Sequence, residues 1–217
     1  SAPVAPSAIQ AKSKVYNDKG FLDTSMPRAL DENEIMDIVN QYTEAAKNAK
    51  QSGFDMIEIH AANGYLIDQF LRDHTNKRSD NYGGNIENRS RFLLEIIDQV
   101  IEIYPAARVG CRIAPVSTFN DISDSNPNEL FTYVAKELGK RNIGYLHVIE
   151  GDTGGDRNNQ AFDYLNLYRA FKEAGGLASM ANNGYTKELA EAAQDEIDLI
   201  CFGRPFISNP DLVEKLQ

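Results

Sequence analysis

The sequence has little of what defines several large classes of protein. Lys and Arg number 22 against 32 Asp and Glu, so the net charge is −10. Because binding to a phosphate backbone needs a basic face, and we find none, nucleic acid is not expected as a partner. No apolar run approaches the length that spans a membrane, and no signal segment is present. We therefore expect a cytoplasmic protein that binds neither nucleic acid nor a membrane.

Cysteine and histidine are also scarce. Cys111 and Cys201 are the two cysteines, and both lie within apolar, strand-like runs. This favours reduced core thiols of a cytoplasmic protein over a disulfide. His74 and His147 have no partner at a spacing suited to a metal, and no zinc or calcium motif occurs. We assign these two histidines to loop and core positions and predict no metal site.

The first 30 residues differ from the rest of the chain because they lack alternating helix and strand patterns. The chain begins with Ser1 and lacks an initial Met, which we interpret as a cut or processed terminus. Residues 1–30 are predicted to be an extended N-terminal segment with a capping hairpin, formed by short strands at 12–16 and 21–24. The turn between these strands is Asn-Asp-Lys-Gly, a strong turn signal.

From residue 31 onward, helical and strand-like patterns alternate. Asp31 and Glu34 resemble a capping box, and apolar residues keep helical spacing from there until Gly53. The following elements are predicted from apolar runs and amphipathic stretches. Strands are expected at residues 54–60, 109–114, 145–149, 177–181 and 197–202, with helices at 86–104, 128–140, 164–174, 187–193 and 210–216.

This order predicts parallel βαβ units with helices covering the sheet. Polar or glycine-bearing residues follow each strand, which fits a (β/α)₈ TIM barrel with its site at the carboxyl ends of the strands. A doubly wound sheet fits the order equally well, although no G-x-G-x-x-G motif follows a strand. We find no repeat or linker, so residues 31–217 are predicted to be five βα units within a single domain, 1–217.

Three polar side chains follow the first predicted strand. His60 and Asn63 are three residues apart, so one helical turn would aim both the same way. Tyr65 carries a phenol that can give a proton. Two hydrogen-bond donors beside an acid suit polarising a carbonyl and protonating a neighbouring carbon. The alternative is a strand-end histidine with local hydrogen bonds and a tyrosine packed in a loop.

A second group contains arginine and glycine. Arg112 lies within an apolar strand. Burying its charge costs free energy unless the charge is paired with an acid such as Glu58, with an anionic ligand, or with a flavin that becomes negative on reduction. The pairs Asn183-Gly184 and Gly203-Arg204 close adjacent strands. Glycine amides and a guanidinium suit a phosphate, which barrels commonly bind after their last two strands. Loop glycines and a surface arginine are the alternative.

Together these stretches resemble the Old Yellow Enzyme family of FMN-dependent ene-reductases. The matching blocks, at residues 60–71, 78–89, 109–115 and 202–212, occur in the family's order. The resemblance implies reduction of the C=C bond of an enone-type substrate, an α,β-unsaturated carbonyl compound. It implies FMN as the cofactor and NAD(P)H as the reductant, acting in the same pocket, so no separate dinucleotide fold is expected.

The resemblance also implies roles for the residues at matching positions. His60 and Asn63 would donate hydrogen bonds to the substrate carbonyl. Tyr65 would protonate the α-carbon after the β-carbon receives a hydride from the flavin. Arg112 would lie beside the flavin ring and stabilise its reduced, anionic form. The FMN phosphate would be held by Asn183, Gly184, Gly203 and Arg204.

One departure from the family is large. Family members carry three more barrel strands before the position of Ser1, and a final segment after Gln217. The five strands here would be the fourth to eighth of the barrel. A (β/α)₈ barrel typically takes about 250 residues, so we expect an incomplete barrel whose open edges need the missing N-terminal strands or a second chain.

Two other hypotheses remain. One is a non-catalytic half-barrel fragment or module that acts by pairing with another chain. The other is a barrel aldolase or isomerase with a phosphate site and no flavin. The sequence disfavours the second of these, because no lysine stands at a predicted strand end to form a Schiff base.

Overall fold

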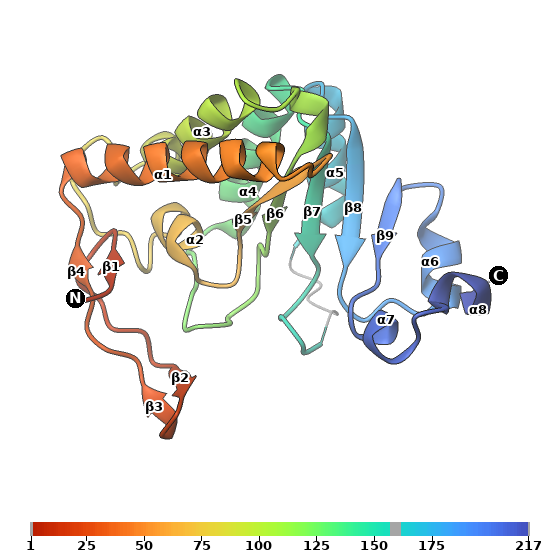
Figure 1. The fold of residues 1–217 in the computed structure, drawn as a ribbon, viewed down its shortest axis with the longest axis horizontal. Helices are drawn as coiled ribbons and strands as arrows, with labels where there is room; N and C mark the ends of the chain where they lie inside the picture. The colour runs from red at the N-terminus through yellow and green to blue at the C-terminus, as the bar shows by residue number, and fades with distance from the viewer. Residues whose placement is uncertain (1, 157–161, 217) are drawn as a thin grey trace.

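The fold is organised around one parallel sheet of five strands (Figure 1). The computed structural model describes residues 2–156 and 162–216. Each strand pairs with its neighbour in the sequence, as the alternating pattern predicts. Within the described residues the sheet stays open, with an edge strand at each side. The strands are β5 (Ile57–Ala61), β6 (Val109–Ile113), β7 (Tyr145–Ile149), β8 (Ala178–Asn182) and β9 (Leu199–Cys201).

Four amphipathic helices form a layer against this sheet (Figure 1). Their apolar stripes supply fully buried side chains, among them Phe92, Phe131 and Phe171. Burial of apolar surface is the main favourable term in folding, so this layer and the sheet together form the core. The helices are α1 (Glu32–Gln51), α3 (Ile86–Ile101), α4 (Pro127–Lys140) and α5 (Tyr164–Glu173).

The two faces of the sheet differ in chemistry because successive residues of a strand point to opposite faces. One face carries Ile59, Cys111 and Leu146, which lie in register and join the core with the helices. The register places polar residues on the other face. One row there reads His60, Arg112 and His147, and the row below it reads Glu58, Gly110 and Tyr145. This polar face and the carboxyl ends of its strands position the site.

The predicted hairpin is confirmed, with β2 (Lys14–Asn17) antiparallel to β3 (Gly20–Asp23). In Figure 1 it projects away from the sheet, on the side where the arrowheads of β7 and β8 point. Its stem is tied to the loop after β6, because the Lys12 amide donates to Asp121 over 2.9 Å and Ser13 donates to Asn120 over 3.1 Å. The hairpin therefore stands beside the carboxyl end of the sheet.

Several short elements were not predicted. The parallel pair β1 (Val4–Ala5) and β4 (Arg28–Ala29) is too short to show a period. The helix predicted at 210–216 begins only at Leu212. The residue before Pro210 is held out of the helical region, with Asn209 at φ −139°, which ends the preceding helix at Ser208. Helix α6 (Lys187–Ala193) has the predicted bounds. The remaining elements are α2 (Leu66–Leu71), the 3₁₀ turn η1 (Ala106–Arg108), α7 (Arg204–Ser208) and α8 (Leu212–Leu216).

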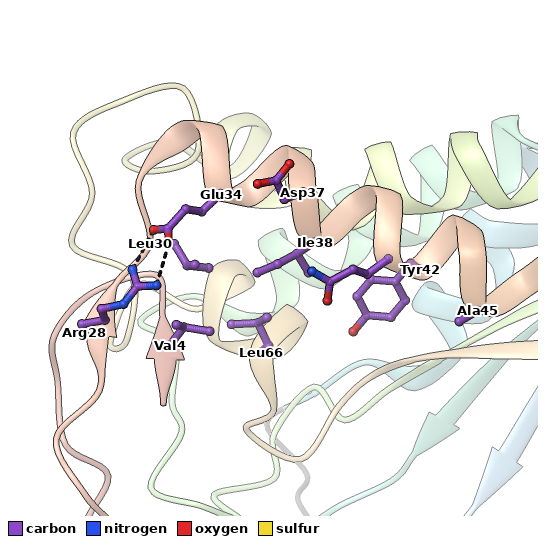
Figure 2. A pocket seen from close by; sticks show the side chains of 10 residues that line it. Val4, Arg28, Leu30, Glu34, Asp37, Ile38, Tyr42, Ala45 and Leu66 are labelled. Atoms are coloured by element: carbon purple, nitrogen blue, oxygen red, sulfur yellow. Dashed lines mark hydrogen bonds and ion pairs between the residues drawn. The ribbon is translucent and has the colours of Figure 1, made fainter. Parts of the chain in front are cut away.

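A groove of about 590 Å³ lies between the β1–β4 pair and α1 (Figure 2). Its polar end is an ion pair in which Arg28 Nη2 lies 2.6 Å from Glu34 Oε1. Glu34 also accepts from the Asp31 amide at 2.9 Å, which completes the predicted capping box. Hydrogen bonding to Arg28 is the main cause that lowers the pKa of Glu34 to about 2. The groove thus marks the attachment of the N-terminal segment to α1.

No helix in the described ranges is both long enough and apolar enough to cross a membrane.

Candidate active site

The turn after β5 presents the first group of predicted residues. Asn63 and Gly64 both have positive φ, 60° and 69°. The Tyr65 amide donates to the carbonyl of Ala62 at 3.3 Å, which closes a turn of type I′, the type that an Asn-Gly pair favours. The prediction that a helical turn aligns His60 with Asn63 was wrong, because His60 belongs to β5 and Asn63 to this turn.

A buried ion pair holds the turn in place. Asp68 accepts from the Gly64 amide at 3.0 Å and from Arg72 Nε at 2.8 Å, and both charged side chains are at most 1% exposed. Arg72 also donates to the carbonyls of Ala114 and Pro115, at 2.5 and 3.0 Å, just after β6. This pair was not predicted from the sequence, although Asp and Arg four residues apart often form an ion pair on a helix.

The three side chains of this group are arranged as two donors and an exposed phenol. The rings of His60 and Tyr65 have centroids 5.5 Å apart, and Tyr65 is 54% exposed. Asn63 Oδ1 accepts from Thr153 Oγ1 at 2.6 Å, so the amide N–H groups are what Asn63 can offer a ligand. Burial, with the charge of Arg112 as a second cause, lowers the pKa of His60 and keeps the ring neutral near pH 7.

Arg112 lies on the polar face, next to His60 in register. Its Nη2 donates to Asn182 Oδ1 at 3.1 Å, while its Nε is buried without a hydrogen-bond partner. The suggested acid, Glu58, is bonded instead to His147, with Glu58 Oε2 and His147 Nδ1 2.8 Å apart. A buried guanidinium N–H without a partner costs free energy of desolvation. A ligand that brings a hydrogen-bond acceptor to Arg112 would recover that cost.

The second group of predicted residues surrounds one cavity of about 660 Å³. Two features shape its wall. Asn183 and Gly184 have positive φ, 101° and 67°, and Asn183 Nδ2 donates to the carbonyl of Glu150 at 2.6 Å, which fixes the loop after β8. A Cβ added at Gly203 would meet nothing within 4 Å. The cavity is lined by all five predicted cofactor residues, Arg112, Asn183, Gly184, Gly203 and Arg204.

The two groups of residues meet at two points. His60, Asn63 and Tyr65 do not line this cavity. Arg112, however, lines it and stands beside His60, and Thr153 lines it and hydrogen-bonds Asn63. The structure therefore places the two donors next to residues of the cavity wall, and Tyr65 lies beside His60.

A parallel βα fold with such a cavity at its carboxyl end is characteristic of enzymes that bind a phosphate-bearing cofactor. The chain belongs to the NADH:flavin oxidoreductase / NADH oxidase family, whose model matches residues 1–217. The predicted family and its flavin cofactor, FMN, are thereby confirmed.

Relatives and solved structures agree with this assignment. The chain is 42% identical over 204 residues to 12-oxophytodienoate reductase 7 of Oryza sativa subsp. japonica, covering 88% of this chain and 52% of that protein. The structure of morphinone reductase in complex with tetrahydroNAD covers the whole chain, with 39% identity and a TM-score of 0.89. An old yellow enzyme homologue from Zymomonas mobilis has 38% identity and a TM-score of 0.91, over 99% of this chain.

The chain spans about half to three-fifths of the length of these proteins, with 52% of the rice protein, 59% of morphinone reductase and 61% of the Zymomonas protein covered. The predicted fold class is confirmed. The five strands are part of a (β/α)₈-barrel fold and form an open sheet within the described residues.

The residues present fit an FMN. A cavity of 660 Å³ lies within the range of about 300–1,000 Å³ that is usual for ligand sites. Arg112 lines this cavity and has a buried Nε without a hydrogen-bond partner, so its guanidinium suits a flavin, which offers acceptor atoms. Arg204 in the wall and the open space at Gly203 suit a phosphate, which needs a close backbone and a bidentate partner.

Proposed function

We propose that this protein reduces the C=C bond of α,β-unsaturated carbonyl compounds, with FMN as its cofactor and NAD(P)H as its reductant. FMN, when bound, supplies the transfer of two electrons between the nicotinamide and the alkene. The observation that carries the proposal is the position of Arg112. It lines the cavity, has an unsatisfied buried N–H, and adjoins His60, beside which the phenol of Tyr65 lies.

The chain's own residues bind and orient the substrate. The neutral His60 ring and the Asn63 amide donate hydrogen bonds to the carbonyl oxygen, which draws electron density from the conjugated alkene. The bond from Thr153 fixes the Asn63 amide with its N–H groups free for this purpose. Tyr65, exposed beside His60, gives its phenolic proton to the α-carbon.

The cofactor is held by a second set of residues. Arg112 would hold the flavin, and its guanidinium would stabilise negative charge on the cofactor. Around the phosphate, Asn183 and Gly184 turn the backbone with positive φ, so that amide groups can approach. Gly203 leaves room beside them, and Arg204 neutralises charge with its guanidinium fork.

Replacing Arg204 with glutamine is expected to raise the dissociation constant of FMN by about tenfold to hundredfold, because a hydrogen bond to a charged group contributes about 1.5–3 kcal/mol. Isothermal titration of the flavin-free protein measures this constant. The matched control is Arg169→Gln on the exposed surface of α5, which should leave the constant unchanged. Equal constants for the Arg204 variant and the parent protein would contradict the phosphate role.

The reaction itself is tested by a turnover assay. The full-length protein should bind FMN, become yellow and oxidise NADPH faster when cyclohexenone is added, with cyclohexanone as the product. A colourless protein, or NADPH oxidation that does not respond to the enone, would contradict the proposal.

A second candidate arises from the open edges of the sheet. Strands β5 and β9 each pair on one side only within the described residues, and unpaired strand edges favour association with another strand. We therefore propose that residues 1–217 form a single partial barrel domain that is completed by further strands, from the same protein or from a second chain. Native mass spectrometry distinguishes these cases: a co-purifying polypeptide supports the second chain, and a single longer chain excludes it.

The proposal includes a cytoplasmic location, because both cysteines are free, as is usual in a reducing compartment.

A further inference from the structure

Behind the wall of the cavity, a buried carboxylate lies between two phenols. Glu150 follows β7 directly and is 6% exposed. Its Oε1 accepts from the phenol of Tyr168, in α5, over 2.9 Å. Its Oε2 accepts from the phenol of Tyr185, in the loop after β8, also over 2.9 Å. Both tyrosines are buried, so one carboxylate joins the end of β7 and the loop after β8 to a helix of the core layer.

The phenols donate in both of these bonds. Burial is the main cause that raises the pKa of Tyr168 well above its ordinary value, and the charge of Glu150 acts in the same direction. The ring therefore keeps its proton near neutral pH and supplies it to the carboxylate. Hydrogen bonds to a charged acceptor are roughly twice as strong as bonds between neutral groups, so the carboxylate binds firmly to the elements that it joins.

The backbone beside Glu150 holds the same loop. The Glu150 amide donates to the Asn182 carbonyl over 3.0 Å, which continues the pairing of β7 with β8. The Glu150 carbonyl accepts from Asn183 Nδ2 over 2.6 Å. The next residue, Gly151, donates its amide to the phenol of Tyr164, in α5, over 2.6 Å. Side-chain and backbone contacts thus tie the segment after β7 to α5 and to the loop after β8.

This cluster can act on the cavity only through neighbouring residues. Asn183 and Tyr185 line the cavity of about 660 Å³, and Gly184 stands between them with φ 67°. Glu150 lies outside this lining. Its negative charge would repel a phosphate, so the carboxylate can favour phosphate binding only by fixing the loop that receives the phosphate.

We propose that Glu150 is a positioning residue for the phosphate end of the flavin cofactor. Its bond to Tyr168 anchors the carboxylate on α5. Its contacts with Asn183 and Tyr185 then hold the turn at Gly184 in the shape that presents backbone amides to the phosphate. The inference deepens the proposed function and rests on it, because the phosphate is that of the proposed FMN.

The test compares two flavins by isothermal titration of the full-length protein after removal of any flavin. FMN carries the phosphate, and riboflavin has the same ring and side chain without it. The ratio of the riboflavin dissociation constant to the FMN dissociation constant therefore measures what the phosphate contributes. A variant that merely destabilises the protein weakens the binding of both flavins alike and leaves this ratio unchanged.

Two variants break the cluster in different ways. Tyr185→Phe keeps the ring and removes the bond to Glu150, whereas Glu150→Asp keeps the charge but is one methylene too short to reach both phenols. We expect each variant to lower the ratio about tenfold, because partners that orient the ligands of a metal typically change its affinity by about 10- to 100-fold.

The matched control is Tyr104→Phe. The phenol of Tyr104 is also buried and also bonds over 2.9 Å, to the carbonyl of Phe54. Phe54 precedes β5, so this bond lies at the amino end of the sheet, opposite the cavity. Its loss should cost stability and leave the ratio of the two dissociation constants at the value of the parent protein.

A parental ratio in folded Tyr185→Phe and Glu150→Asp variants would overturn the inference, while FMN binding by the parent protein would still support the proposed function. A fall confined to Tyr185→Phe would assign the effect to the phenol and overturn the role of Glu150. A parent protein that binds neither flavin would overturn the proposed function and this inference with it. Tyr185→Phe removes a single hydroxyl, so the test remains decisive even where Glu150→Asp does not fold.

Discussion

Replacing Tyr65 with phenylalanine is expected to slow reduction of an enone by about 10²- to 10⁴-fold, while reduction of the flavin by NADPH stays close to that of the parent protein. The phenol is the proposed acid, and it is 54% exposed and next to the His60 ring. Phenylalanine keeps the ring and removes the proton. Rapid-mixing absorbance of the flavin in each half-reaction separates the two effects.

The matched control is Tyr133→Phe on α4, away from the cavity, which should change neither half-reaction. An equal fall in both half-reactions for the Tyr65 variant would contradict its role as a proton donor. It would indicate that the phenol supports the site as a whole.

Replacing Arg72 with methionine is expected to lower the free energy of unfolding by about 3–5 kcal/mol, the usual cost of breaking a buried ion pair from one side. The change leaves the Asp68 carboxylate buried without its partner, and it removes donors from the carbonyls after β6. Because Asp68 also accepts from the Gly64 amide, the turn that carries Asn63 should lose order. Urea denaturation measures the loss of stability.

An exposed ion pair provides the control for this variant. Lys47 and Glu44 lie 2.6 Å apart on α1, with side chains 45% and 65% exposed, so Lys47→Met should change stability by less than about 1 kcal/mol. Similar losses in the free energy of unfolding for Lys47→Met and Arg72→Met would contradict a larger stabilising effect of the buried pair. A double variant, Asp68→Leu with Arg72→Met, should recover part of the lost stability, because no charge is then left buried.

The sheet was predictable because its strands are short apolar runs between clear turn signals. The strand at 145–149 has the predicted bounds, and the other four differ from prediction by one or more residues at an end. The shared cavity of the five residues predicted to bind the cofactor has a related reason. Strand ends in a parallel sheet meet at one edge, so residues in or just after separate strands line one cavity, while their role in binding the cofactor stays a prediction.

Two ion pairs were not predicted from the sequence, one within the short helix α2 and one between strands that are far apart in the sequence. The helix α2 has only six residues and lies within the stretch interpreted as a site motif, so its Asp68 was not paired with Arg72. His147 was assigned to the core, and it is buried, but it also bonds Glu58, which lies 89 positions earlier. Alternation with Leu146 and Val148 would have placed His147 on the polar face.

The most direct test of the central claim is a single turnover under anaerobic conditions. The full-length protein, loaded with FMN and reduced with one equivalent of NADPH, is mixed with cyclohexenone, and the absorbance of oxidised flavin is followed with the product. We expect oxidised flavin to return as cyclohexanone forms, in equal amounts, and this return to be slow in the Tyr65→Phe variant. Flavin that stays reduced until oxygen is admitted, with no cyclohexanone formed, would contradict it.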